Sequence, residues 1–134
     1  MPVEENKAVA RRWNEILNGK KFEAFDQVLH PDYVNHSGSD SSWAITSQGL
    51  EQAKHRFAEV FQRAPGWQVV IEDLIGEGDR VVVRGTFTNE GKPTANFIGF
   101  YRFSDGKIVE NWWAYDAMGM MQQITKPPES DPGQ

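Results

Sequence analysis

The sequence contains no cysteine. This absence excludes disulfide bonds, thiol catalysis and cysteine-ligated metal, and it leaves the redox compartment of the protein open. The chain also has no cluster of Lys and Arg, and its formal net charge is -5 at pH 7. Because affinity for nucleic acids rests on clustered basic side chains, we expect no nucleic-acid partner.

Long apolar runs are missing as well. No stretch approaches the roughly 20 apolar residues of a membrane span, and residues 1–6 have neither the basic nor the apolar region of a signal peptide. We therefore expect no membrane partner and a cytoplasmic location. Metal-ligand spacings, phosphate-binding loops and serine nucleophile elbows are missing too, so we expect no metal and no cofactor. An enzyme with this sequence would use cofactor-free acid/base chemistry.

Aromatic residues, in contrast, are plentiful. They make up 12% of the 134 residues, with five Trp and eight Phe. The length suits one domain with a single core. So many aromatic rings in one small domain indicate either a heavy core or a cavity lined by rings.

Helical spacing of apolar residues marks the first half of the chain. It predicts helices over 4–18, 21–29 and 47–63. Gly19 is placed as the C-terminal stop of the first helix. Pro31 is expected to end the second, because the residue before a proline is pushed out of the helical region.

The second half alternates polar and apolar residues, which is typical of strands. Strands are expected over 67–75, 80–88, 94–103 and 107–116. The short connections predict an antiparallel meander. Helices followed by a strongly curved antiparallel sheet define an α+β domain, which we place at 1–125. Residues 126–134 contain three prolines and are expected to form a flexible tail.

The last strand carries the main catalytic candidate, Asp116. Alternation divides the strand into two sets of side chains, Glu110, Trp112, Ala114 and Asp116 on one face and Asn111, Trp113 and Tyr115 on the other. If the first face points inward, desolvation beside Trp112 favours neutral Asp116 and makes it a usable acid or base. The alternative is that Asp116 caps a final helical turn.

Three further polar residues have expected roles: His36, Asn35 and Glu110. His36 could orient or polarise a carbonyl, or be solvated beside a polar loop. Asn35 could contribute one hydrogen bond. Glu110 is too far from Asp116 along the strand to form a carboxylate pair with it, so we expect it to form an ion pair with Arg84 or Arg102.

The order of these elements, with particular residues, resembles the SnoaL-like polyketide cyclases of the NTF2-like (cystatin-like) superfamily. The resemblance extends to about Ile124, and its marks are Trp13, Pro31 to His36, Gly49, Gly78 to Arg84, Asp105 to Glu110, Trp112 and Asp116. It implies a cone in which the sheet wraps around the helices. It also implies that Asp116 is the general acid/base of an intramolecular aldol ring closure and that His36 is a pocket histidine. Where many relatives carry His after Glu110, this chain has Asn111.

We therefore expect a cyclase or isomerase acting on a small, apolar, carbonyl-containing molecule. Asp116 and His36 are its predicted catalytic residues, and the predicted substrate-binding residues are Asn35, Trp13, Tyr33, Trp112 and Phe57. The alternative is a non-catalytic domain of the same fold that binds a small molecule or dimerises. A homodimer is compatible with either function, and the sheet face with Trp113 and Tyr115 is its expected interface.

Overall fold

The computed structural model describes residues 2–36 and 47–115 of the chain. Its elements are α1 (Pro2–Gly19), the 3-10 helix η1 (Phe22–Ala24), α2 (Phe25–Val28), β1 (Leu29–Asn35), β2 (Ser47–Gln48), α3 (Leu50–Arg63), β3 (Trp67–Glu77), β4 (Arg80–Asn89), β5 (Lys92–Ser104) and β6 (Lys107–Tyr115). The predicted tail, 126–134, lies outside the described residues. No described helix is long and apolar enough to cross a membrane.

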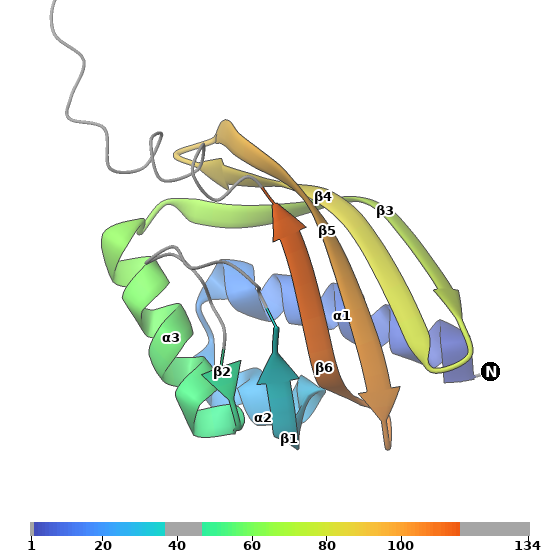
Figure 1. Ribbon diagram of the computed structural model, residues 1–134. Coiled ribbons are helices and arrows are strands. Elements are labelled where there is room, and N and C mark those ends of the chain that lie inside the picture. The colour runs from blue at the N-terminus through green and yellow to red at the C-terminus, as the bar shows by residue number, and fades with distance from the viewer. Residues whose placement is uncertain (1, 37–46, 116–134) are drawn as a thin grey trace, which may run out of the picture.

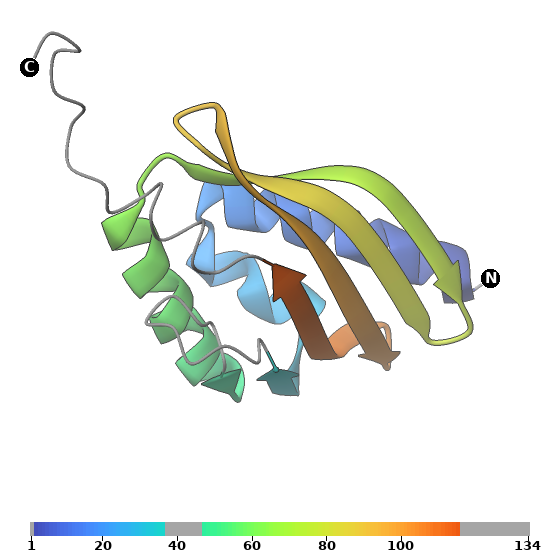
Figure 2. The ribbon, with the colours of Figure 1, turned by 45° about the horizontal axis from the view of Figure 1, so that its top comes forward.

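One six-stranded sheet, in the order β2-β1-β6-β5-β4-β3, wraps around the helices (Figures 1 and 2). The meander β3 to β6 is antiparallel, as predicted. The sheet is nevertheless mixed, because β1 pairs in parallel with β6, placing Asn35 beside Asn111. Alternation within single strands could not show this pairing, which joins segments more than 70 residues apart. The predicted α+β architecture is confirmed.

The helix ends differ in detail from the prediction. Helix α1 ends at Gly19, but the residue with the left-handed backbone is Lys20, with φ of 53°. The second helical segment stops at Val28, and Pro31 lies inside β1 instead of ending a helix. Pro31 lies where the β1–β6 register shifts, between Leu29 and Val34, and proline, which has no N–H to donate, is tolerated at such irregularities. Helix α3 begins after Gly49, and Ser47 belongs to β2.

Two glycines let the strands of the curved sheet approach the core rings closely. A Cβ added at Gly85 would lie 2.6 Å from the Phe97 ring and would also meet the Val70 carbonyl oxygen. A Cβ at Gly99 would lie 3.0 Å from the Trp113 indole. Real Cβ atoms essentially never approach heavy atoms to less than 3.0 Å. Glycine at these positions therefore allows the concave face to close on its aromatic contents.

Aromatic rings fill the space between the helices and the sheet. Trp13 of α1 packs edge-on against Phe25 and Phe57, with centroids 4.8 and 5.6 Å away. Phe57 of α3 in turn lies 6.0 Å from the Trp113 ring of β6. Offset and edge-to-face ring pairs of this kind add to the free energy of simple burial. The heavy aromatic core is therefore what joins α1, α3 and the sheet.

The face of β6 that points inward carries Asn111 and Trp113, and it is opposite to the face of Trp112. Trp113 is 3% exposed and Asn111 is fully buried, whereas Trp112 is 37% exposed on the outer face. The hypothesis that Trp112 and its neighbours face the interior is therefore wrong. The proposed dimer interface through Trp113 is wrong for the same reason. The buried contacts that Asn111 and Trp113 make inside the protein decide which face of β6 points inward.

Truncating the two indoles should show this difference directly. Trp113→Ala is expected to lower the free energy of unfolding by about 3–5 kcal/mol, because it leaves a cavity among packed rings. Trp112→Ala should cost less than half as much, because its ring is partly exposed. Urea denaturation of both variants provides the measurement. A loss for Trp112→Ala equal to or larger than that for Trp113→Ala would contradict this orientation of β6.

Candidate functional site

A polar cluster lies buried inside the aromatic core, where β1, β5 and β6 meet. It consists of Tyr33, Tyr101, Asn111 and Trp113, each no more than 4% exposed. The parallel pairing of β1 with β6 brings Tyr33 to Asn111, and the antiparallel pairing of β5 with β6 sets Tyr101 opposite Asn111. We call these four residues the interior cluster.

Hydrogen bonds connect the interior cluster into a chain. The Asn111 amide lies 3.1 Å from the Tyr33 hydroxyl. In the amide orientation that satisfies both of its ends, the nitrogen donates to Tyr33, and the oxygen accepts from the Trp113 indole at 3.2 Å. The same indole donates to the Tyr101 hydroxyl at 3.0 Å. A connected network of this kind holds each polar group in a fixed direction within a medium of low polarity.

Burial keeps both phenols of the cluster protonated. It raises the pKa of Tyr33 well above its ordinary value, and the nearby Tyr101 raises it further, against the hydrogen bond with Asn35. Burial likewise raises the pKa of Tyr101. Tyr115, at the end of β6, has its pKa raised by burial to about 12. These hydroxyls are therefore hydrogen-bond donors throughout the physiological pH range.

A small void lies next to the interior cluster, between α1 and the sheet. Its volume is about 10 Å³, and Trp13, Asn14 and Tyr101 line it together with apolar side chains. The Trp13 indole nitrogen and the Asn14 side-chain oxygen are buried without a hydrogen-bond partner. A void of this size has room for about one water molecule. A donor, an acceptor and a phenol thus surround a space that suits a single oxygen atom.

The predicted substrate-binding residues divide between this interior and the outer face. Trp13, Tyr33, Asn35 and Phe57 are all buried on the concave side. Trp112 is the exception, on the outer face. Asp116 lies outside the described residues, so the structure does not show its surroundings. Its predicted role as acid/base stays a prediction, as do the binding roles.

His36 also lies on the outer face, away from the interior cluster. Its ring stacks on Trp112 with centroids 4.9 Å apart, and its Nε2 lies 3.0 Å from a Glu110 carboxylate oxygen. Arg102 donates to the other Glu110 oxygen at 2.6 Å. The prediction of a Glu110 ion pair is confirmed for Arg102, whereas Arg84 pairs with Glu72 and Asp73. We call His36, Arg102, Glu110 and Trp112 the outer cluster.

Asn111 and Trp113 were not predicted as site residues from the sequence. The available signal was Asn111, a polar residue at the position where many relatives have His. That the Asn111 side chain points inward can be inferred only when the inward face of β6 is known. Within the described residues, no group of three or more His, Asp or Glu side chains could hold a metal ion.

The curved mixed sheet around an aromatic interior defines an α+β cone of the NTF2-like class. The family model of the SnoaL-like polyketide cyclases matches residues 7–124. The chain therefore belongs to the SnoaL-like polyketide cyclase family. A search of curated proteins gives no significant match.

Solved structures agree with this assignment. A candidate polyketide cyclase from Bacillus cereus ATCC 10987 shares 27% identity and superposes with a TM-score of 0.75, covering 90% of this chain and 80% of its own. Bal32a, from a soil-derived mobile gene cassette, has 16% identity and a TM-score of 0.81 over 92% of this chain and 98% of its own. TsrD from Streptomyces laurentii has 20% identity and a TM-score of 0.73 over 90% and 95%. For Bal32a and TsrD, at 16% and 20% identity, the likeness shows the fold alone.

The outer cluster predicts a pH dependence of stability. Desolvation acts to raise the pKa of Glu110, but the hydrogen bonds and positive charges of Arg102 and His36 outweigh it, so the pKa is lowered. A lowered pKa in the folded state means that the ionised carboxylate stabilises the fold. This contribution is complete above the unfolded-state pKa of about 4.3 and is lost as the pH falls through the folded-state value.

Glu110→Gln should therefore lower the melting temperature at pH 7, and the difference from wild type should shrink steadily as the pH falls from 5 toward 3. Thermal denaturation followed by circular dichroism provides the measurement. Glu15→Gln, at an exposed carboxylate of α1, is the matched control and should change little at any pH. A Glu110→Gln difference that is constant from pH 7 to pH 3 would contradict the ion-pair assignment.

Proposed function

We propose that this SnoaL-family chain catalyses a cofactor-free ring closure or isomerisation of a small, apolar carbonyl compound. Family membership supports a cyclase-type role. The observation that supports the proposal best is the interior cluster, which sets one protonated phenol, that of Tyr101, beside a void for one oxygen atom. Buried donors in fixed directions suit a carbonyl oxygen that gains negative charge during the reaction.

In this proposal the substrate's carbonyl oxygen occupies the water-sized void and accepts a hydrogen bond from Tyr101, while the core side chains around the void move apart to admit the body of the substrate. The Trp13 indole, whose N–H has no partner, supplies a second donor. The interior cluster keeps Tyr101 in place through Trp113 and Asn111. Because the interior excludes bulk water, each of these hydrogen bonds is stronger than it would be in solution.

Asp116 is the proposed acid/base, the role that the family resemblance implies for it, and the described part of β6 ends one residue before it, at Tyr115. Its carboxylate removes a proton from the carbon next to the carbonyl, and the electron pair moves to the oxygen held by Tyr101. In an isomerisation, the proton returns at another carbon. In a ring closure, the enolate carbon forms a bond to a second carbonyl of the same molecule, and the resulting alkoxide takes the proton from Asp116.

His36 has a supporting role in this proposal. Its backbone N–H donates to the Asn111 carbonyl at 2.7 Å, which fixes the end of β1 against β6. Its ring belongs to the outer cluster. His36 thus assists as a positioning residue, by holding the strand that carries Tyr33 and Asn35 beside the strand that carries Asn111.

Proton exchange at a carbon next to a carbonyl tests the proposal without knowledge of the natural substrate. 2-Tetralone, an apolar bicyclic ketone, is incubated in D2O with the full chain, and loss of its α-proton signals is followed by NMR. We expect the protein to accelerate exchange. Asp116→Asn should reduce the acceleration by about 10²–10⁴-fold, and Tyr101→Phe by about 100-fold.

Asp26→Asn, at an exposed carboxylate of α2, is the control and should exchange the ketone at the wild-type rate. Folding of each variant is checked by circular dichroism. An Asp116→Asn variant that retains the wild-type acceleration would rule out Asp116 as the base. A Tyr101→Phe variant with the full rate would rule out the interior cluster as the site that binds the carbonyl.

A second candidate function is dimerisation through the outer face of the sheet. Trp112 and Ile98 are among the exposed large apolar residues. The β5–β6 pairing sets Phe100 opposite Trp112 and Ile98 opposite Ala114, which makes a continuous apolar strip. Exposed apolar surface of this kind is typical of protein interfaces. A homodimer would cover the strip and is compatible with catalysis in the interior.

Size-exclusion chromatography with light scattering at micromolar concentration tests the dimer. We expect the mass of two chains for the wild type and of one chain for Ile98→Lys, because an unpaired charge would be buried in the interface. Gln68→Lys on the outer side of β3, away from the strip, should leave the dimer intact. A monomeric wild type at this concentration would contradict the second candidate.

A further inference from the structure

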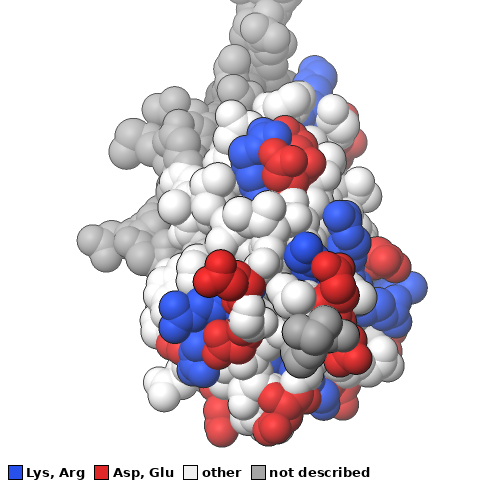
Figure 3. All heavy atoms as spheres, turned by 90° about the vertical axis from the view of Figure 1, so that its right-hand side faces the viewer, with Lys and Arg blue, Asp and Glu red and all other residues white. Residues whose placement is uncertain are grey.

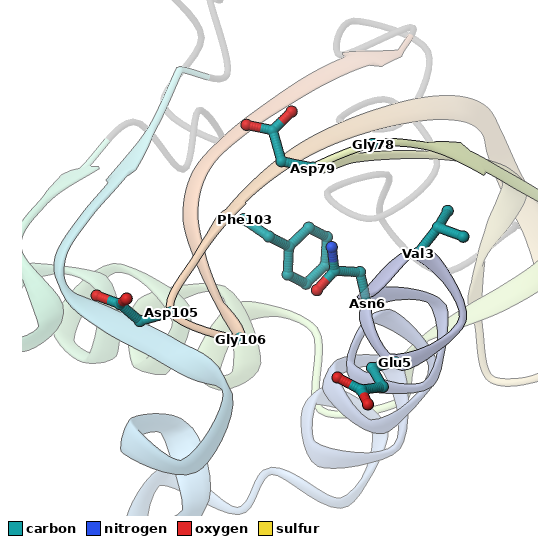
Figure 4. A pocket seen from close by; sticks show the side chains of 8 residues that line it. All are labelled: Val3, Glu5, Asn6, Gly78, Asp79, Phe103, Asp105 and Gly106. Carbon is teal, nitrogen blue, oxygen red and sulfur yellow. The ribbon is translucent and has the colours of Figure 1, made fainter. Parts of the chain in front are cut away.

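A second pocket lies at the end of the molecule where α1 begins, and it shares no residue with the interior cluster. Its volume is about 420 Å³, within the range of small-molecule sites. The first turns of α1, the β3–β4 turn, the end of β5 and the β5–β6 turn form its walls (Figure 4). Neither the sequence analysis nor the proposed function assigns a role to it.

Two hairpin turns border this pocket. Gly78 and Gly106 have positive φ values of 59° and 76°, and a Cβ at either would meet no atom within 4 Å. The backbone N–H of Phe103 donates to the Asp79 carbonyl at 2.8 Å, which ties the end of β5 to the β3–β4 turn. The hollow is thus framed by backbone contacts between strands.

Asn6 is the polar group inside this pocket. It is only 6% exposed, it lines the hollow, and its amide lies beside the Phe103 ring (Figure 4). Among the described residues its side chain has no hydrogen-bond partner. Buried amides in folded proteins almost always have one. An unpartnered amide that faces a pocket therefore indicates a ligand group that completes its hydrogen bonding.

Three acidic residues line the pocket that contains Asn6, and in the close-up the carboxylates of Asp79 and Asp105 point away from the Asn6 amide (Figure 4). Glu5, Asp79 and Asp105 lie around the pocket in the close-up (Figure 4), and the surface view of this end shows carboxylates interspersed with basic groups (Figure 3). Asp79 lies 3.6 Å from Arg80. The Asp105 carboxylate lies 4.0 Å from the His30 ring, and Glu5 has no ion pair within the described residues.

The remaining charge of this rim is negative. The start of α1 contributes partial positive charge from its free N–H groups, but Glu4 and Glu5 in the first turn offset it. The carboxylates do not form a group that could share a metal ion, at least within the part of the chain described. A single cationic group on an organic molecule fits this arrangement better than a divalent metal.

We infer that this pocket binds a primary ammonium compound with an apolar body. The ammonium has three N–H donors, which suit the Asn6 side-chain oxygen together with a rim carboxylate. The apolar body lies on Phe103 and Val3, which supply the apolar wall. The three features required by such a ligand, a buried acceptor, negative charge and an aromatic surface, come from three separate parts of the chain.

The test is an NMR titration of the full chain, labelled with 15N, with 2-phenylethylammonium at low ionic strength. We expect shift changes at the backbone amides of residues 3–6, 78–79 and 103–106. 2-Phenylethanol, which lacks the charge, should bind about tenfold more weakly or worse. The trimethylammonium derivative, which keeps the charge but has no N–H to donate, should also bind more weakly.

Variants of the pocket residues separate the contribution of the Asn6 acceptor to binding from that of the negative charge. Asn6→Leu should raise the dissociation constant about tenfold by removing the acceptor, and Asp79→Asn should raise it by a smaller factor. Glu51→Gln, in the first turn of α3, is matched to a carboxylate in the first turn of α1 and should leave binding unchanged. Asp79→Asn is a surface change, so it tests the site even if Asn6→Leu destabilises the fold.

Equal binding of 2-phenylethanol, shift changes confined to other parts of the chain, or unchanged affinity in both Asn6→Leu and Asp79→Asn would overturn the inference. Asp116 takes no part in this site. Failure here would therefore leave the proposed acid/base function untouched, and loss of exchange activity in Asp116→Asn would leave ammonium binding intact.

Discussion

The orientation of β6 is the constraint on which the rest of the structure depends. Inside, Asn111 joins Tyr33 of β1 and Trp113 joins Tyr101 of β5, so this strand connects both neighbours through the core. Outside, Glu110 joins His36 and Arg102. A register shift of β6 by one residue would turn its ion-paired side chains inward and expose the indole of Trp113. Core packing and surface charge thus favour the same orientation.

This orientation also separates the two kinds of chemistry in the molecule. The concave side holds neutral polar groups whose phenols stay protonated because burial raises their pKa values. The outer side holds charged groups in partly solvated ion pairs, where a lowered carboxylate pKa stabilises the fold. Neutral hydrogen-bond donors in an apolar interior suit negative charge that develops on a bound molecule.

The pocket at the start of α1 depends on a different part of the fold. The start of α1, the end of β5 and two hairpin turns form its walls, and the turns contain Gly78 and Gly106 in left-handed conformations. The two sites that we propose therefore differ in electrostatic character. The interior is proposed to offer donors to an oxygen atom, whereas the pocket beside Asn6 is proposed to offer an acceptor and negative charge to a cation.

The sequence by itself determined the helical segments, the four strands of the meander, the α+β class and the family, because hydrophobic periodicity, turn residues and short motifs are local properties of the chain. It also identified Glu110 as half of an ion pair. It could not determine which face of β6 points inward, because each face carries one Trp together with polar residues, and a bulge between Ile108 and Glu110 interrupts the alternation of the strand. Only the tertiary structure decided this, since the choice depends on partners as distant in sequence as Tyr33, which the parallel pairing of β1 and β6 brings to Asn111.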